Sequence, residues 1–450
     1  MSTDPSSDPI ILPQVALQHD FTSVFADIRD NTVFSEDIFL SCYQLGLRPV
    51  HGKVNASHDE SVASPDGILL ESRDGVELTR LDSHTFTASC PALSIVNTIL
   101  RAPRQGFSIN PIENTTNVRR ISAFDVTSNA ALIAIGHYDG TITIQSVSTP
   151  SDPEAQKFPL TTKKLHLSSV LSLRFFPSNK VLLSASSDLS LNIISATPPS
   201  DSNSLELLAV PRVLKGHKAG ITDTAIIGVG RRVLSCAKDG TVRLWDVGKG
   251  EKISTLASER FAPIVKMAMS GRIPSSAIPP EPVETADSQT DVDENVIYAA
   301  LQNGAFNVFD LRTRNLIYAS PTSRISSSSK AALGAIAVDD SSYFLATGSQ
   351  GGFIRVYDSR YLPPQSLFTF QRSNSSIEDL HFVPSKDGEG APQLLVATGD
   401  GFPFCASLHP DGPKVAEELV GFADESVTVI RTDGKGAVWA AGHDGIVRKY

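Results

Sequence analysis

Three residue types that could form a hydrolase site lie close together near the middle of the chain. His217, Ser235 and Asp239 are the types of a triad in which a histidine takes the proton of a serine hydroxyl and a carboxylate orients the ring. The same side chains could instead form a structural network with Trp245 beside them, because a buried histidine needs hydrogen-bond partners for its ring nitrogens. We interpret them as structural and assign no catalytic residue.

Other cofactor, metal or nucleotide chemistry is not indicated. The cysteines lie far apart without a Cys-x-x-Cys pair, which argues against a zinc ribbon or a disulfide framework. They are Cys42, Cys90, Cys236 and Cys405. We interpret Cys236 as a small buried hydrophobic residue, and Gly228-Val-Gly230 as a turn because it lacks the third glycine of a dinucleotide motif. The sequence therefore predicts no cofactor, no metal and no enzyme.

Composition limits the kinds of partner. The 450 residues include 39 Lys+Arg and 49 Asp+Glu, a formal net charge of −10, and 41% are hydrophobic. Such a chain can bury a large core, whereas its acidic balance argues against general binding to nucleic acid or anionic membranes. Neither a secretory signal nor an apolar run near the roughly 18 residues of a spanning helix is visible. We expect a soluble protein of the cytosol or the nucleus.

A short unit recurs seven times: an apolar run, a tight turn and an alternating run. The turns begin at residues 139, 188, 239, 303, 351, 400 and 444, at intervals of 44 to 51 residues apart from one of 64. Pairs such as Asp239-Gly240 accept positive φ at both central positions of a hairpin turn. We therefore expect a hairpin in every unit, with both turn residues in the left-handed region.

The runs around each turn give the fold class. Residues 241–245 alternate with the period of a half-buried strand, whereas residues 131–135 are continuously apolar, as in a strand covered on both faces. With one strand before and one after, each unit of about 50 residues describes a propeller blade. We predict an all-β, seven-bladed β-propeller over residues 96–450. Its blades are expected at about 118–165, 166–214, 215–260, 261–325, 326–372, 373–420 and 421–450.

The segments outside the repeated units are assigned from their composition and their position in the chain. Residues 1–95 have no repeat signature and are interpreted as a small N-terminal extension. The seventh unit stops at its third strand, so we expect its missing outer strand to come from upstream, around residues 84–89. The Pro/Ser/Asp/Glu-rich segment 271–294 is expected to be a disordered insert of the fourth blade, and residues 385–392 a second insert in the sixth.

Acidic residues are expected to gather on one face of the ring. The turn aspartates should share this face with the loops that lead into the blades, and a negative face attracts basic partners. The predicted partner-binding residues are Asp188, Asp223, Glu378, Asp379, Asp400, Asp424, Glu425 and Asp444. A merely solvated acidic surface is the alternative.

The repeat resembles the WD-repeat family. His217 lies 23 residues before Gly240, and the unit closes with Trp245-Asp246, as the family pattern requires. Other units replace this ending with Phe309-Asp310 or Tyr357-Asp358, and the second unit has lost both the glycine and the tryptophan. The resemblance implies WD40 blades in which His217, Ser235, Asp239 and Trp245 are structural.

Three segments look more specifically like the proteasomal ATPase-associated factor family, the WD-repeat chaperones of regulatory-particle assembly. They are residues 214–227, 231–246 and 442–450. The resemblance implies a non-catalytic, monomeric chaperone that binds the C-terminal domain of an AAA-ATPase subunit of the proteasome base, with other base assembly chaperones as further candidate partners.

Two Asp-x-Arg boxes leave a second function open. Phe309–Arg312 and Tyr357–Arg360 look like the boxes of WD substrate receptors of cullin-RING ubiquitin ligases. Local pairing of Arg312 and Arg360 with blade carboxylates is the simpler interpretation. A scaffold in ribosome or RNA assembly is a third alternative, which the acidic charge disfavours.

Overall fold

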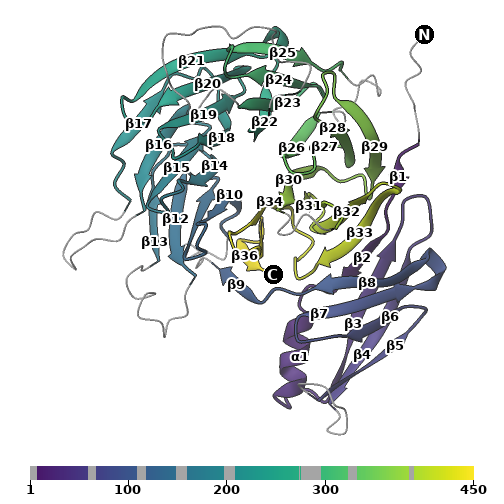
Figure 1. Cartoon of the computed structure of the whole chain (residues 1–450). Helices are drawn as coiled ribbons and strands as arrows, with labels where there is room; N and C mark the ends of the chain where they lie inside the picture. Colours follow the sequence, from purple (N-terminus) through teal and green to yellow (C-terminus); the bar gives the residue numbers. More distant parts are fainter. Residues whose placement is uncertain are drawn as a thin grey trace, which may run out of the picture.

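The chain forms a closed ring of β-sheets. The computed structural model describes residues 8–58, 67–108, 118–147, 160–196, 208–272, 274, 295–322, 332–384 and 390–450. Within these residues, seven sheets built on four antiparallel strands follow one another around the ring (Figure 1). The innermost strand of each contacts that of the next, and the seventh contacts the first. This arrangement confirms the predicted all-β propeller.

Most blades run from the centre outward in sequence order. The first blade consists of β10 (Ile121–Val126), β11 (Leu132–His137), β12 (Thr141–Ser146) and β13 (Thr161–Lys164). The second consists of β14 (Val170–Phe175), β15 (Val181–Ser186), β16 (Ser190–Ser195) and β17 (Arg212–Lys215). The third consists of β18 (Ile221–Ile227), β19 (Arg232–Ala237), β20 (Thr241–Asp246) and β21 (Glu251–Ala257). The fourth blade consists of β22 (Ile264–Ser270), β23 (Val296–Leu301), β24 (Phe306–Asp310) and β25 (Asn315–Ala319). The fifth consists of β26 (Leu333–Asp339), β27 (Phe344–Ser349), β28 (Phe353–Asp358) and β29 (Gln365–Gln371). The sixth blade contains β30 (Ile377–Val383), β31 (Gln393–Thr398), β32 (Phe404–His409) and β33 (Gly412–Leu419). The seventh contains β34 (Val427–Thr432), β35 (Val438–Gly442) and β36 (Ile446–Lys449). The short 3-10 helix η2 (Glu259–Phe261) joins the third blade to the fourth.

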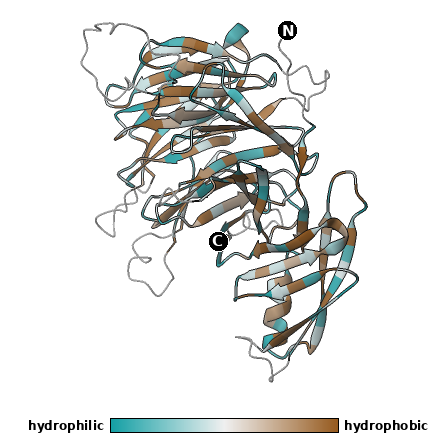
Figure 2. Cartoon of the chain, turned by 45° about the vertical axis from the view of Figure 1, so that its right-hand side comes forward, coloured by the Kyte–Doolittle hydropathy of each residue, from teal (hydrophilic) through white to brown (hydrophobic). Residues whose placement is uncertain are grey.

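The core lies between neighbouring blades. All six residues of β11 and of β23 are buried, as expected for strands covered on both faces. Ile142 of the first blade packs in one cluster with Leu182 of the second, and Val242 of the third packs with Ile297 of the fourth. Figure 2 shows hydrophobic residues along the strands of the ring, interspersed with hydrophilic ones.

The turns differ from the prediction in one respect. Gly140 and Gly240 have φ of +85° and +72°, but the aspartates before them are not in the left-handed region. The Asp239 carboxylate instead accepts the backbone N–H of Thr241 at 3.0 Å, which holds the aspartate in ordinary backbone geometry. The expectation of positive φ at both positions is therefore wrong.

The N-terminal residues form a domain with its own core. One sheet contains β2 (Gln14–Leu17), β3 (Ser35–Tyr43), β4 (Val50–His58) and β5 (Ile68–Arg73). Strands β6 (Glu77–Arg80), β7 (Thr85–Cys90) and β8 (Ile95–Arg101) extend the sixth blade, because β8 pairs in parallel with β33. Helix α1 (Phe21–Arg29) buries one face in the shared core, and the 3-10 helix η1 (Pro91–Leu93) links β7 to β8.

The strand that closes the seventh blade is β9 (Gln105–Ser108), antiparallel to β36. The prediction of residues 84–89 is wrong, because β7 is already paired on both edges, with β6 and β8. The ring therefore takes its closing strand from beyond the predicted 1–95 extension. Phe107 of β9 stacks on Trp439 of β35, with ring centroids 5.7 Å apart.

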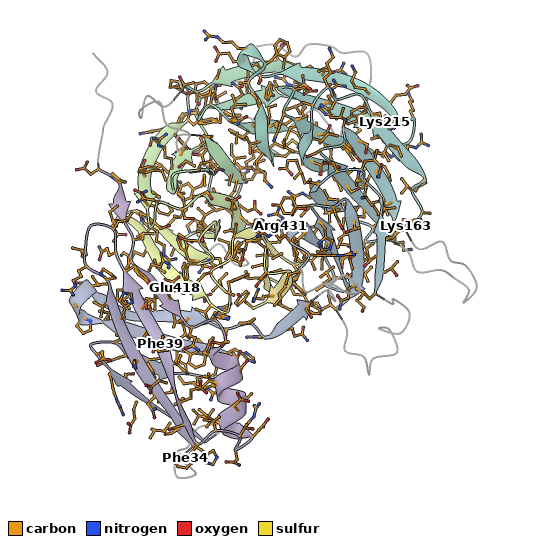
Figure 3. All side chains as sticks on the ribbon, turned by 180° about the vertical axis from the view of Figure 1, so that it is seen from behind. Phe34, Phe39, Lys163, Lys215, Glu418 and Arg431 are labelled. Carbon is orange, nitrogen blue, oxygen red and sulfur yellow. The ribbon has the colours of Figure 1, made fainter. Side chains whose placement is uncertain are left out.

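A buried ion pair of the ring also holds the N-terminal domain through a backbone hydrogen bond. Both carboxylate oxygens of Glu418 lie 2.6 Å from a guanidinium nitrogen of Arg372, and Oε1 also accepts the backbone N–H of Val15 at 3.1 Å. Glu418 lies where the two parts meet (Figure 3). Strand β1 (Ile10–Ile11) adds to the outer edge of β29, so the N-terminal segment spans the fifth and sixth blades.

Two expectations fall outside the described residues. The predicted insert 271–294 is described only at Gly271, Arg272 and Pro274, and residues 385–389 of the second insert are also outside. Within the described part of the chain, no helix is long and apolar enough to span a membrane.

Replacing the aromatic side chain of the closing strand should destabilise the ring. Phe107→Ala removes the stack on Trp439, and we expect a loss of about 1–3 kcal/mol in the free energy of unfolding, below the cost for a fully buried ring because Phe107 is half-buried. The exposed neighbour Ser108→Ala should change it by less than about 0.5 kcal/mol. Equal denaturant midpoints for the two variants would contradict the assigned closure.

Candidate partner-binding face

The three side chains with triad-like types and Trp245 form a buried network in the third blade. The Nδ1 of His217 lies 3.0 Å from Asp239, its Nε2 lies 2.7 Å from the Ser235 hydroxyl, and the Trp245 indole N–H donates to Ser235 at 2.8 Å. The Ser235 side chain is fully buried, so no substrate carbonyl can reach its hydroxyl. The network links a loop, two strands and the turn.

Electrostatics within this network favour a charged Asp239. Burial alone would raise its pKa, but hydrogen bonds from His217 and Thr241 hold the pKa of the carboxyl well below its usual range. The carboxylate also accepts the backbone N–H of Lys218 at 2.8 Å. Asp239 therefore fixes the loop before the blade as well as the turn.

A second network of this type lies in the neighbouring blade and was missed in the sequence. His166 contacts Asp188 at 3.0 Å and the Ser184 hydroxyl at 2.8 Å. The signal was available: the histidine precedes the serine by 18 residues and the aspartate by 22 in both blades. Ile194 occupies the place of the tryptophan, so the unit appeared to have lost its signature.

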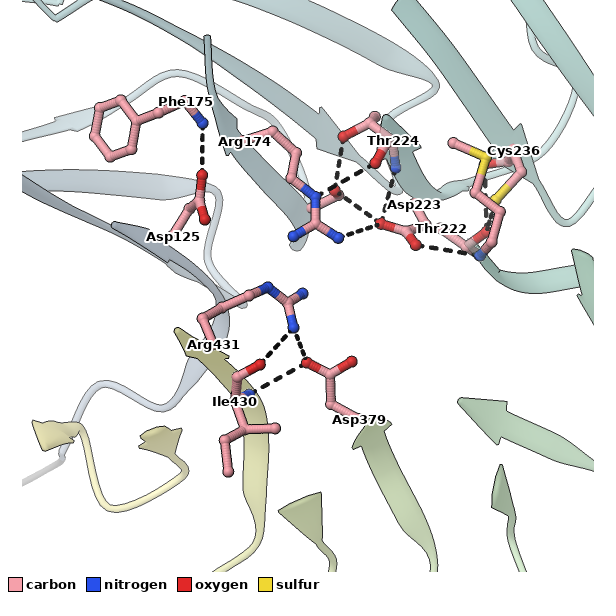
Figure 4. Close-up of polar contacts among 12 residues, drawn as sticks. Asp125, Arg174, Phe175, Thr222, Asp223, Thr224, Cys236, Asp379, Ile430 and Arg431 are labelled. Atoms are coloured by element: carbon pink, nitrogen blue, oxygen red, sulfur yellow. Dashed lines mark hydrogen bonds and ion pairs between the residues drawn. The ribbon is translucent and has the colours of Figure 1, made fainter. Parts of the chain in front are cut away.

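Two of the predicted binding residues lie in the central channel rather than on the face. Asp223 is buried 3.6 Å from Arg174, and Asp379 is buried in an ion pair with Arg431 (Figure 4). Their placement on an exposed acidic surface is therefore wrong. Each lies on the innermost strand of its blade, where the side chain turns into the channel.

These channel aspartates hold neighbouring blades together. Asp223 accepts the backbone N–H of Met267 at 3.2 Å, and Asp379 accepts that of Ile430 at 3.2 Å, each from the next blade. Asp125 of the first blade does the same, accepting the Phe175 N–H of the second blade at 2.6 Å. Burial would raise the pKa of Asp379, but the charge of Arg431 outweighs it and holds the pKa low.

The turn aspartates of the prediction are largely engaged inside the protein. Asp188 belongs to the His166 network, and Asp444 forms a 2.6 Å ion pair with Arg448. Asp400 accepts the Ser373 hydroxyl at 2.7 Å. These three carboxylates hold turns and loops, so they add less to the outer surface than the sequence suggests.

Three of the predicted acidic residues remain accessible. Asp424 is exposed, and Glu378 and Glu425 are partly exposed. They lie on what we call the turn face, the side of the ring with the turns between second and third strands and the loops that lead into the blades. A Cβ added to the turn glycine Gly401 would lie 2.9 Å from the Glu425 backbone, which places Glu425 beside the sixth turn.

The same face exposes apolar side chains that the sequence analysis did not single out. Leu167 is 89% exposed, Phe261 65%, Tyr138 46% and Leu189 37%. Their backbones belong to the turns or contact them: Leu167 N–H donates to Asp188 at 2.9 Å, and Phe261 lies against Gly240. We call these four residues the apolar arc. The sequence signal for this apolar surface was Leu189, which occupies a turn position that is glycine in the other six units.

Leu189 adopts a conformation that a leucine rarely takes. Its φ is +73°, close to that of the glycines in the equivalent turns. A left-handed conformation costs roughly 1–2 kcal/mol for a residue with a Cβ. An exposed leucine at a strained position points to a role in contact rather than in stability.

Comparison with known proteins agrees with this geometry. The WD40 family, described as WD domain, G-beta repeat, matches residues 157–195 and 209–246, which include both network histidines. The chain contains WD40 repeats. Each match covers the outer strand of one blade and the three inner strands of the next, the second blade for the first match and the third blade for the second.

Three curated proteins are similar to parts of this chain. A 90-residue stretch is 46% identical to the 26S proteasome regulatory subunit RPN14 of Saccharomyces cerevisiae, covering 20% of this chain and 19% of that protein. Ribosome biogenesis protein YTM1 of Podospora anserina is 24% identical over 264 residues, 56% of this chain and 52% of its own. Apoptotic protease-activating factor 1 of Danio rerio is 24% identical over 220 residues, which cover 44% of this chain and 16% of that protein. The chain thus spans about half or less of each relative.

The arginines of the two Asp-x-Arg boxes pair within their own boxes. The Arg312 guanidinium lies 3.5 Å from Asp310, and Arg360 contacts both carboxylate oxygens of Asp358. Arg360 also lies 5.4 Å from the centre of the Tyr343 ring. Both arginines therefore form local pairs with blade carboxylates, as in the simpler interpretation of the sequence.

The remaining reactive side chains are buried or scattered. All four cysteines are free and buried, and burial raises the pKa of the Cys236 thiol, so it is not a nucleophile at neutral pH. Among the described residues, no group of three or more His, Cys, Asp or Glu side chains is arranged to hold a metal ion.

The Asp239 network should make stability depend on pH. Because the folded-state pKa of Asp239 lies below the unfolded value near 4, its contribution is present above about pH 4 and is lost as the pH falls through the folded-state value. We expect Asp239→Asn to lower the free energy of unfolding by about 1–3 kcal/mol at pH 7. The difference in the free energy of unfolding between Asp239→Asn and the wild type should narrow below pH 4.

Denaturant unfolding of both proteins between pH 7 and pH 2 measures this difference. Asp27→Asn, on the exposed side of α1, is the control and should follow the wild type throughout. A deficit that stays constant down to pH 2 would show that the charge of Asp239 does not stabilise the network.

Proposed function

We propose that this WD40 propeller is a non-catalytic assembly chaperone that binds the C-terminal domain of an AAA-ATPase subunit of the proteasome base. The observation that carries the proposal is the 46% identity over 90 residues to RPN14, which is named as a 26S proteasome regulatory subunit. A chaperone that acts on the assembling base works in the cytosol or the nucleus.

The turn face is the proposed contact surface. It combines the accessible carboxylates of Glu378, Asp424 and Glu425 with the apolar arc. Burial and, after it, the charge of Glu378 raise the pKa of Tyr138, so the acidic residues border one end of the arc. A partner that offers basic side chains beside an apolar patch fits this combination.

The alternative role as a cullin-RING substrate receptor is not favoured. Its sequence support was the pair of Asp-x-Arg boxes, and the guanidinium groups of Arg312 and Arg360 are engaged by Asp310 and Asp358. Each box is thus accounted for by an ion pair inside its own blade, without an adaptor protein.

Charge reversal on the turn face should abolish binding. We expect the triple variant Glu378→Lys, Asp424→Lys, Glu425→Lys to lose pull-down of the ATPase C-terminal domain, because it replaces attraction with repulsion towards a basic surface. Asp379 is excluded from this set because its buried ion pair is structural.

The matched control reverses three exposed glutamates of the N-terminal domain, Glu36, Glu71 and Glu77, and changes the net charge by the same amount. It should bind as the wild type does. Normal binding by the turn-face variant, or equal loss in both variants, would rule out this surface.

The apolar arc should contribute independently of charge. Leu167→Asp removes a side chain that is 89% exposed, so we expect little change in stability but at least a tenfold weaker complex. Val229→Asp is the control, because Val229 is 71% exposed in the loop between β18 and β19 on the opposite side of the ring. Equal affinities measured by calorimetry would remove the arc from the interface.

Affinity purification of the full chain tests the function itself. The proposal expects proteasome base ATPase subunits with other assembly chaperones and without core peptidase subunits. Recovery of a cullin adaptor or of ribosome precursors instead would overturn it.

A further inference from the structure

A cavity on the turn face opens between the first and the seventh blade. It has a volume of about 520 Å³. Its walls include Val118, Arg119, Arg120, His137, Tyr138 and His443, with Asp139 at the same site. The first three precede β10, the next two end β11 and begin its turn, and His443 comes from the seventh turn. Two neighbouring blades therefore build the cavity together.

Its arginines have uncommitted charge. Within the described residues, Arg119 and Arg120 form no ion pair, and the buried Nε of Arg119 has no hydrogen-bond partner. Buried arginines elsewhere in the ring lie in ion pairs, as Arg372 does with Glu418 and Arg431 with Asp379. A guanidinium group prefers a carboxylate or a phosphate as its partner.

His137 adds an unsatisfied hydrogen-bond acceptor. The side chain is 1% exposed, and its Nδ1 lies 3.2 Å from the backbone carbonyl of Arg120. A carbonyl can only accept, so Nδ1 carries the hydrogen and Nε2 presents a lone pair in the neutral ring. This Nε2 has no hydrogen-bond partner, which is costly for a buried polar atom.

The opposite wall is fixed in position. The Tyr138 hydroxyl and the Nε2 of His443 lie 2.9 Å apart, and their rings meet edge to face with centroids 5.6 Å apart. Asp139, the acidic residue at this site, uses Oδ1 to accept the N–H and the hydroxyl of Thr141. Burial would raise the pKa of Asp139, but these hydrogen bonds and the charge of Arg119 hold it low. This carboxylate therefore offsets part of the positive charge of the two arginines, and Arg120 supplies the remainder.

We propose that this cavity binds an anionic group carried by a peptide, a carboxylate or a phosphate. The oxyanion pairs with Arg119 and Arg120, and a neighbouring peptide N–H donates to the Nε2 of His137. Val118 and the Tyr138 ring supply apolar contact for the rest of the segment. This site goes beyond the proposed chaperone function, because its chemistry is opposite in sign to the acidic residues of the same face and does not depend on which protein is bound.

Short peptides and histidine NMR signals test the site in the full-length protein. The probes are acetylated and amidated pentapeptides, Ala-Ala-X-Ala-Ala, in which X is glutamate, glutamine or phosphoserine. The readout is the ring signal of His443, assigned by substitution. The signals of His166 and His217 serve as internal controls, because both rings are buried in separate networks.

We expect a saturable shift of His443 with the glutamate or the phosphoserine peptide, and at least tenfold weaker binding of the glutamine peptide. The tighter of the two anionic peptides identifies the preferred group. Arg119→Ala with Arg120→Ala should abolish the shift. Lys218→Ala with Lys238→Ala removes the same charge from exposed positions of the third blade on this face and should leave the shift unchanged.

Three results would overturn the site: no saturable shift with either anionic peptide, equal binding of the glutamine peptide, or an unchanged shift in the arginine variant. In the arginine variant, unchanged His166 and His217 signals show that the second and third blades remain folded, and in the lysine variant the His166 signal serves this purpose. Because no ATPase domain is present, the outcome is separate from that of the chaperone proposal.

Discussion

The architecture depends on one strand pairing, that of β9 with β36. The C-terminal sequence supplies only three strands of the seventh blade, and an unpaired outer edge there would leave backbone groups open to another chain. Strand β9 fills that edge, and Phe107 stacks on Trp439 behind it. The chain just before β9 must then run beside the ring, so β8 lies along β33 and the N-terminal domain sits against the sixth blade. Closure and domain placement therefore have one cause.

The repeat was readable from the sequence because its signals are local. Turn residues, the alternation of residues 241–245 and the apolar run 131–135 each depend on neighbours a few positions away. The closing strand was not readable, because Gln105–Ser108 is short, polar and far in sequence from its partner. The left-handed backbone expected at the turn aspartates failed for a local reason: a side-chain hydrogen bond from the Thr241 N–H competes with it.

The acidic residues show why side-chain direction limits prediction of a site. Asp379 and Glu378 are adjacent in sequence, yet one is buried with Arg431 in the channel and the other is accessible on the turn face. Successive residues of a strand point in opposite directions, and the sequence does not reveal which carboxylates have an arginine waiting on another blade. The cavity of Arg119, Arg120 and His137 was missed for the same reason, since its two walls come from blades at opposite ends of the propeller sequence.

The turns both stabilise the ring and present its surface, and the two roles fall on different residues. Buried networks around His166 and His217 hold the loops of the second and third blades, which keeps Leu167 in place although its side chain makes little contact with the protein. Glycine would be the more stable residue at the second turn, yet the chain has Leu189 there at φ +73°. Leu189 therefore weakens the fold and enlarges the exposed apolar surface that the proposed partner would cover. The second blade thus combines a buried histidine network of the WD40 type with an exposed leucine at a turn position that is glycine in the other six units.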